Sequence, residues 1–260
     1  MMLKRKNHSA PVVYVVMGLL ELFCFAMLLH SLITGQWLYA LMCLANAVLV
    51  VAPQLLQRWL DLQISAVFEI FLMIFTVLAI IVGTVLDVYY LTNWLDLAVH
   101  AFSGFLVAAI GFQLYSIMNR HSLETPSLAY RCVTAFCASL AVAVLWEFWE
   151  YFVFSLFDMD MQHDSVLNRL CTSYFTNKDG VSDIFENITS MTLVADGKTY
   201  EINGYLDMGF IDTMTDMLAC FGGTIVFLVG VFAGKERFIE LFTPQRKLTD
   251  GKKTRASETV

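Results

Sequence analysis

The chain has 260 residues, of which 58% are hydrophobic and only 15% are charged. Soluble globular domains are about half apolar and about a quarter charged, so this composition indicates a membrane protein. The formal net charge of −7 argues against nucleic acid as a partner. The six cysteines include no CxxC pair, which argues against a thiolate zinc site.

Six apolar runs follow one another along the chain, each near the roughly 20 residues that a helix needs to cross the hydrocarbon core of a bilayer. A backbone inside lipid must satisfy its own hydrogen bonds, so we expect all six runs to be helices. The sequence therefore predicts an all-α polytopic helix bundle that forms a single transmembrane domain over 1–260. The predicted spans are approximately 12–34, 37–53, 64–86, 95–117, 132–157 and 210–232.

Basic residues predict the orientation of these spans, because Lys and Arg accumulate on the cytoplasmic side of membranes. If the N-terminus is cytoplasmic, 13 of the 16 Lys and Arg lie on the cytoplasmic side. The others, Arg169, Lys178 and Lys198, share one loop. We expect a protein of the bacterial cytoplasmic membrane with both termini in the cytoplasm and a cytoplasmic tail over 233–260.

The segment 158–209 is the one sizeable predicted extracytoplasmic loop, and it is acidic. Within it, the stretch SMTLVADGKTYEI alternates around Asp196 and Gly197. An Asp-Gly pair between alternating residues is typical of a tight β-hairpin turn. Asp207, just before the last span, is placed to cap the first turn of that helix.

The last three spans each carry a pair of ionisable residues near their outer ends. A charge inside lipid costs at least about 2.5–3.5 kcal/mol on insertion scales. The two members of each pair are three or four residues apart, so they share one helix face. The three pairs are Asp96 with His100, Glu147 with Glu150, and Asp212 with Asp216.

These pairs occupy similar depths, roughly 8–15 Å below the outer helix ends at about 1.5 Å rise per residue. Gly104 on the fourth span and Gly222 and Gly223 on the sixth favour close helix packing. No Lys or Arg occurs in these spans to neutralise the acids. We therefore expect bound protons or a divalent metal ion, with Mg, Mn, Fe or Zn suited to carboxylate and imidazole ligands.

Three motifs occur in a fixed order in the second half of the chain. Asp-x-x-x-His lies within 96–104, Trp-Glu-x-x-Glu within 145–150, and Asp-Thr-Met-x-Asp-Met with a following Gly pair within 204–223. This order resembles the YjdF-like family of bacterial inner-membrane proteins and, more loosely, VanZ-like proteins. The resemblance implies a multi-spanning bacterial membrane protein and names no substrate.

Three functional hypotheses remain open. The first is a metal-dependent enzyme acting on lipid or lipid-linked substrates, with membrane lipids as partners. The second is a proton- or cation-coupled transporter or channel, in which Glu21 and Glu69 extend a path inward. The third is a structural or accessory protein held together by a buried polar network. The sequence contains no GxSxG, HExxH or P-loop signature that would identify an enzyme. We interpret His163 as a surface residue and Trp146 as an interfacial or packing residue.

Overall fold

The computed structural model describes residues 10–60, 62–119, 126–176 and 180–246. The basic residues of 1–9 and 247–260, on which the predicted orientation partly depends, lie outside this range, as do Arg120 and Lys178. The chain divides into two compact units. One comprises the described residues up to Ala143 and those from Leu218 onward, and the other runs from Val144 to Met217.

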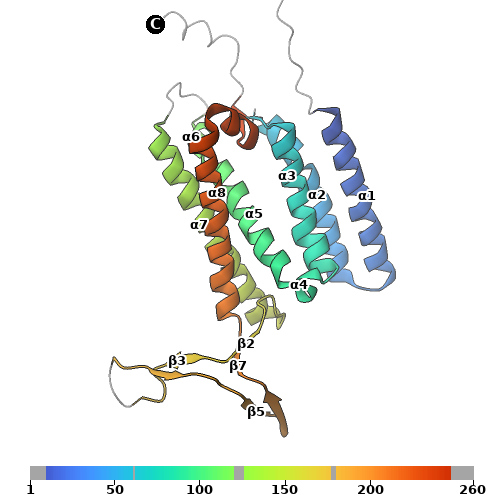
Figure 1. Cartoon of the computed structure of the whole chain (residues 1–260). Helices are drawn as coiled ribbons and strands as arrows, with labels where there is room; N and C mark the ends of the chain where they lie inside the picture. The colour runs from blue at the N-terminus through green and yellow to red at the C-terminus, as the bar shows by residue number, and fades with distance from the viewer. Residues whose placement is uncertain (1–9, 61, 120–125, 177–179, 247–260) are drawn as a thin grey trace, which may run out of the picture. The chain divides into compact units, whose positions relative to one another are not determined.

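Long helices dominate the described residues (Figure 1). Six of them are long and apolar enough to cross a membrane, which confirms the predicted all-α, six-span architecture. The helices are α1 (Pro11–Ile33), α2 (Trp37–Trp59), α3 (Ala66–Thr76) continuing into the π-helical segment η1 (Val77–Val85), α4 (Val88–Leu91), α5 (Asn93–Gly111), α6 (Leu114–Met118), α7 (Leu128–Phe157) and α8 (Phe210–Phe242).

Three helices differ from their predicted spans. Helix α2 continues through Pro53 to Trp59, although the predicted span stops at 53. The fourth predicted span is broken after α5, and Gln113 separates it from the short α6. The Gln113 amide donates to the Thr243 hydroxyl at 3.2 Å, so a contact far along the chain accompanies the break. Helix α8 runs ten residues past the predicted end at 232.

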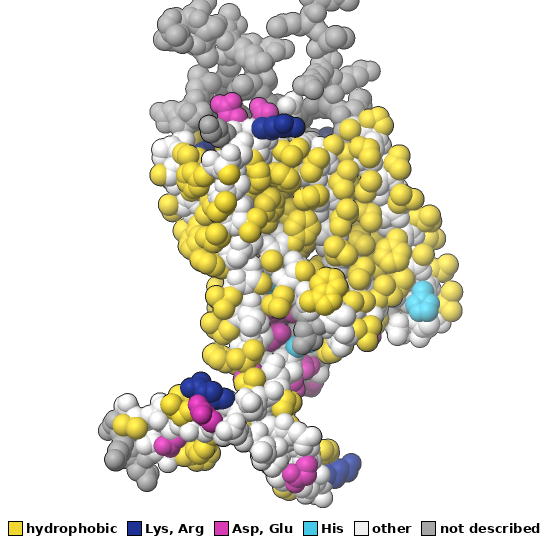
Figure 2. Space-filling view, in the orientation of Figure 1, with side chains coloured by type: hydrophobic (Ala, Val, Ile, Leu, Met, Phe, Trp, Pro, Cys, Tyr) yellow, Lys and Arg dark blue, Asp and Glu magenta, His cyan; other side chains and the backbone are white. Residues whose placement is uncertain are grey.

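In the first unit, α1, α2 and α3 lie side by side around an apolar core that includes Val13, Val50 and Met73 (Figure 1). A second core joins α3, α5, α7 and α8 through aromatic residues such as Phe112 and Phe227, whose rings lie 5.7 Å apart. The helical surface in view is largely hydrophobic (Figure 2). Exposed apolar side chains are the expected lipid-facing surface of a helix bundle.

Glycines bring α5 and α8 into backbone contact. A Cβ atom on Gly104 would lie 2.1 Å from the Cys220 carbonyl oxygen, and one on Gly223 would lie 1.7 Å from the Ala101 carbonyl oxygen. Any side chain at either position would therefore separate the helices. The predicted close packing is confirmed for Gly104 and Gly223. It is wrong for Gly222, where a Cβ atom would meet nothing within 4 Å.

The second unit contains the end of α7, the start of α8 and three antiparallel strand pairs between them (Figure 1). The pair β2–β7 joins the beginning and the end of the loop. The strands are β2 (Ser165–Leu167), β3 (Leu170–Thr172), β4 (Asp183–Phe185), β5 (Met191–Ala195), β6 (Lys198–Ile202) and β7 (Tyr205–Asp207); β1 (Leu62–Gln63) and β8 (Gln245–Arg246) pair in the first unit.

The predicted hairpin is present as β5 and β6, with Asp196 and Gly197 at its turn. Both turn residues have positive φ, 51° and 72°, as a type I′ turn requires. The predicted cap is also present, because the Asp207 carboxylate accepts the Ile211 backbone N–H at 2.8 Å. These two features fix both the fold of the loop and the point at which α8 begins.

Candidate functional site: buried carboxylates in the membrane helices

Three of the predicted ligands converge in the second unit. Glu147 and Glu150 extend from α7 and Asp216 from α8, and all three are buried, with relative exposures of 6%, 5% and 1%. One carboxylate oxygen from each lies within 4.8 Å of one from each of the others. Two oxygens bound to one Mg²⁺ at 2.0–2.1 Å are at most about 4.2 Å apart, and at Ca²⁺ distances about 5 Å. The 4.8 Å limit is therefore within reach of a Ca²⁺-sized cation, and a shared Mg²⁺ would need the oxygens to approach one another more closely.

Electrostatic repulsion makes it costly for all three carboxylates to be ionised at once. Two unit charges 4.8 Å apart repel by about 3.5 kcal/mol at an effective dielectric constant of 20. Three ionised carboxylates would accumulate about 10 kcal/mol from the three pairs, besides the penalty for burying each charge. The segments 144–157 and 210–217 contain no Lys or Arg. Shared protons or a bound cation would relieve this repulsion.

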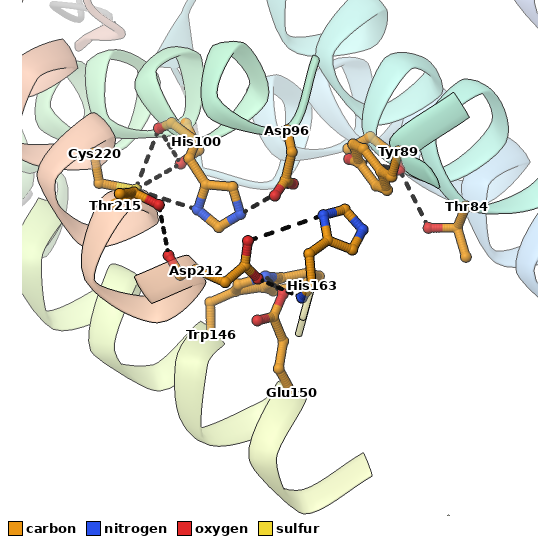
Figure 3. Close-up of polar contacts among 12 residues, drawn as sticks. Thr84, Tyr89, Asp96, His100, Trp146, Glu150, His163, Asp212, Thr215 and Cys220 are labelled. Carbon is orange, nitrogen blue, oxygen red and sulfur yellow. Dashed lines mark hydrogen bonds and ion pairs between the residues drawn. The ribbon is translucent and has the colours of Figure 1, made fainter. Parts of the chain in front are cut away.

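Trp146 holds one member of the cluster in place. Its indole N–H donates to a Glu150 carboxylate oxygen at 2.6 Å, one helical turn away on α7 (Figure 3). A hydrogen bond to a carboxylate is stronger than one between neutral groups and fixes the orientation of the acceptor. This is a contact that the sequence interpretation of Trp146 as an interfacial or packing residue missed.

Asp212 has a different environment within the same unit. One carboxylate oxygen accepts the His163 backbone N–H at 2.9 Å, and the other lies 3.9 Å from His163 Nδ1 (Figure 3). Gln162, next to His163, donates through its side-chain amide to the Thr213 hydroxyl at 2.8 Å. Asp212 is in the first turn of α8, where a negative charge stabilises the helix dipole. The Asp212 carboxylate thus attaches the loop to the start of the helix.

The remaining predicted pair lies in the first unit. His100 is buried on α5, and its Nε2 lies 3.6 Å from an Asp96 carboxylate oxygen one turn earlier (Figure 3). Its Nδ1 lies 3.8 Å from the Cys220 thiol on α8. The thiol also lies 3.4 Å from the Ser103 hydroxyl and donates to the His100 carbonyl oxygen at 3.2 Å. The result is a polar chain of carboxylate, imidazole, thiol and hydroxyl groups.

The structure thus supports the predicted ligands unequally. Glu147, Glu150 and Asp216 form one cluster, whereas Asp212 is held by His163. Metal ligation stays a prediction for all six residues. The interpretation of His163 as simply a surface residue is wrong, since both its backbone and its ring approach Asp212. No pattern in the sequence signals that contact, which joins residues 49 positions apart.

A model of predicted membrane proteins, DUF2238, matches residues 12–236. No curated protein matches the chain, and no solved structure does. The match includes all six membrane-spanning helices and every residue of the carboxylate cluster. The chain is a multi-pass membrane protein that belongs to the DUF2238 family of predicted membrane proteins.

Proposed function

We propose that the protein is a metal-dependent membrane enzyme that acts on a lipid or lipid-linked substrate, with Glu147, Glu150 and Asp216 as metal ligands. The observation that carries the proposal is the convergence of these three buried carboxylates from two membrane helices. An all-oxygen ligand set suits Mg²⁺ or Mn²⁺ better than softer metals, so we favour these two among the metals expected from the sequence. We also infer that the chain is YjdF-like and lies in a bacterial cytoplasmic membrane with both termini in the cytoplasm.

A metal in this cluster would act as a Lewis acid on a phosphoryl or carbonyl oxygen and would lower the pKa of a bound water. Catalysis also needs a general base within hydrogen-bonding reach of that water. Substrates would enter laterally from the lipid, since the cluster belongs to membrane-spanning helices.

The metal content of the purified protein tests the proposal. We expect near-stoichiometric Mg or Mn by mass spectrometry in the wild type, and loss of that metal in Asp216→Asn and Glu150→Gln. Glu201→Gln is the matched control, because Glu201 is an exposed acid of the same unit that bonds Thr192 on the neighbouring strand. A wild type that stays metal-free after loading, while folded, would refute the metalloenzyme.

A second candidate is a proton- or cation-coupled transporter, and one observation favours it. Glu69 on α3 is fully buried within the first unit. Glu21 on α1 has a buried carboxylate oxygen that no hydrogen bond within the described residues reaches. Such groups inside membrane helices are typical of proton relays. Proton flux into vesicles that contain the protein, abolished by Glu69→Gln, would support transport; equal flux in both would exclude this path.

The third candidate, a purely structural polar network, makes the opposite prediction. A neutral replacement that retains hydrogen bonding, such as Asp216→Asn, would leave both stability and biological activity unchanged. Such a network would have to keep its carboxyl groups protonated, and it would contribute little to stability, because interhelical polar contacts average only about 0.6 kcal/mol each.

A further inference from the structure

An apolar groove opens on the first unit between α3, α5 and α8, with a volume of about 650 Å³. Its walls are the rings of Phe71, Phe102, Phe105, Phe238 and Phe242, and small residues that include Gly222 form its floor. We call this feature the Phe groove. None of the described residues that line it is charged, and its volume lies within the roughly 300–1,000 Å³ of typical ligand sites.

The groove exists because of the way in which α5 and α8 pack. Gly223 abuts the Ala101 carbonyl, while the adjacent Gly222 faces open space. The walls are held by edge-to-face aromatic contacts, with ring centroids 5.5 Å apart for Phe71 and Phe102 and for Phe105 and Phe242. Aromatic pairs in this geometry add about 0.5–1.5 kcal/mol beyond their buried area. The groove is therefore a stiff feature of the unit.

We propose that the Phe groove holds one hydrocarbon chain of a membrane lipid. Most of its lining belongs to membrane-spanning helices, so lipid is the medium around it. Water gains nothing in a hollow without polar partners. A partner helix is about 10–12 Å across with a pitch of about 5.4 Å, so each turn occupies about 420–610 Å³, and the groove would admit fewer than two turns. An extended hydrocarbon chain is thinner and fits this volume.

A polar contact lies at one end of the groove, where the polar part of a lipid would be accommodated. On α5 the lining begins at Ala101, directly after His100, and on α8 it begins at Ala219, directly before Cys220. The His100–Cys220 contact, continued to Asp96, thus marks the end of the groove nearest the start of both helices. A lipid whose tail lies against the phenylalanines would present its polar part there.

The test uses the full chain in vesicles of phosphatidylethanolamine and phosphatidylglycerol that carry a photoactivatable group on one acyl chain. We expect crosslinks on peptides that contain Phe102, Phe105 and Val226. In Gly222→Leu a side chain fills the floor without a backbone clash, and crosslinking there should fall about tenfold or more. Gly18→Leu on α1 is the matched control, because a Cβ atom there also meets nothing within 4 Å but lies outside the groove.

Undiminished crosslinking in Gly222→Leu, or labelling no denser than at exposed positions of α1, would overturn the inference. So would crosslinks to a second copy of the chain in place of lipid. Metal content is measured on the same samples, which separates the two proposals. Groove labelling without metal retains the hydrocarbon site and removes the metalloenzyme. Metal without groove labelling removes the hydrocarbon site alone.

Discussion

Adding a single methyl group at Gly223 should destabilise the protein, whereas the same change at Gly222 should not. A Cβ atom on Gly223 would lie 1.7 Å from the Ala101 carbonyl oxygen, and ordinary contact needs 3.4 Å or more, so α5 and α8 would have to separate by up to 1.7 Å. Overpacking of this kind costs about 1–3 kcal/mol, occasionally more. Because the atom in the way is backbone, we expect the upper end, about 3 kcal/mol.

The control is the neighbouring glycine. Alanine stabilises a helix interior by about 0.5–1 kcal/mol relative to glycine. Gly222→Ala should therefore leave the stability of the protein unchanged or raise it slightly. For a chain of this size 1 kcal/mol shifts Tm by about 2–4 °C, so Gly223→Ala should lower Tm by about 6–12 °C. The assay is thermal unfolding in detergent, followed by size-exclusion chromatography of the surviving protein. Equal Tm values for the two variants would refute the close contact between α5 and α8.

Three further predictions concern the polar groups. Trp146→Phe removes the hydrogen-bond donor to Glu150. The free energy of unfolding in a denaturant titration should therefore fall by about 1.5–3 kcal/mol, and an unchanged value would mean that the hydrogen bond is absent. Burial, with the nearby Asp160 and Asp207 carboxylates, raises the pKa of Asp164. Ionisation of Asp164 therefore opposes folding at pH values above the usual carboxyl pKa of 3.8. We expect Asp164→Asn to raise Tm at pH 7 and to leave Tm unchanged below pH 3.8. Finally, a chelator should lower Tm if a cation neutralises the cluster, and excess Mg²⁺ should restore it.

The sequence predicts the membrane architecture well because two strong local signals specify it. Runs of apolar residues mark the spans, and the Asp196-Gly197 turn marks the hairpin. The errors occur where tertiary contacts override hydropathy. Lys235 and Glu236 end the apolar run of the sixth span, yet α8 continues to Phe242. Phe238 and Phe242 are four residues apart, and their rings pack at 4.9 Å within an aromatic core that a hydropathy window does not detect.

The sequence predicts which charged residues are candidates for the site, but it does not predict which of them meet. Spacing of three or four residues places each acidic pair on one helix face, but it does not state which pairs meet across helices. Glu150 and Asp216 lie 66 positions apart, and their encounter depends on the strand pairs that return the chain from α7 to α8. Asp212, with the same spacing from Asp216 as His100 has from Asp96, is instead held by His163. Periodicity therefore selects candidate residues, and the fold between the helices determines which of their carboxylates meet.

The same contrast explains why two adjacent glycines have opposite roles. A Gly pair in a membrane helix predicts close packing at both positions, yet neighbouring residues on a helix point about 100° apart and cannot both face the same partner. Gly223 faces α5, and Gly222 turns toward the groove. A chain selected only for helix packing would have no need of glycine at position 222, since alanine or leucine there would favour the helix. Its presence is accounted for if the space beside it is occupied by something other than protein, which is the condition that the crosslinking experiment examines.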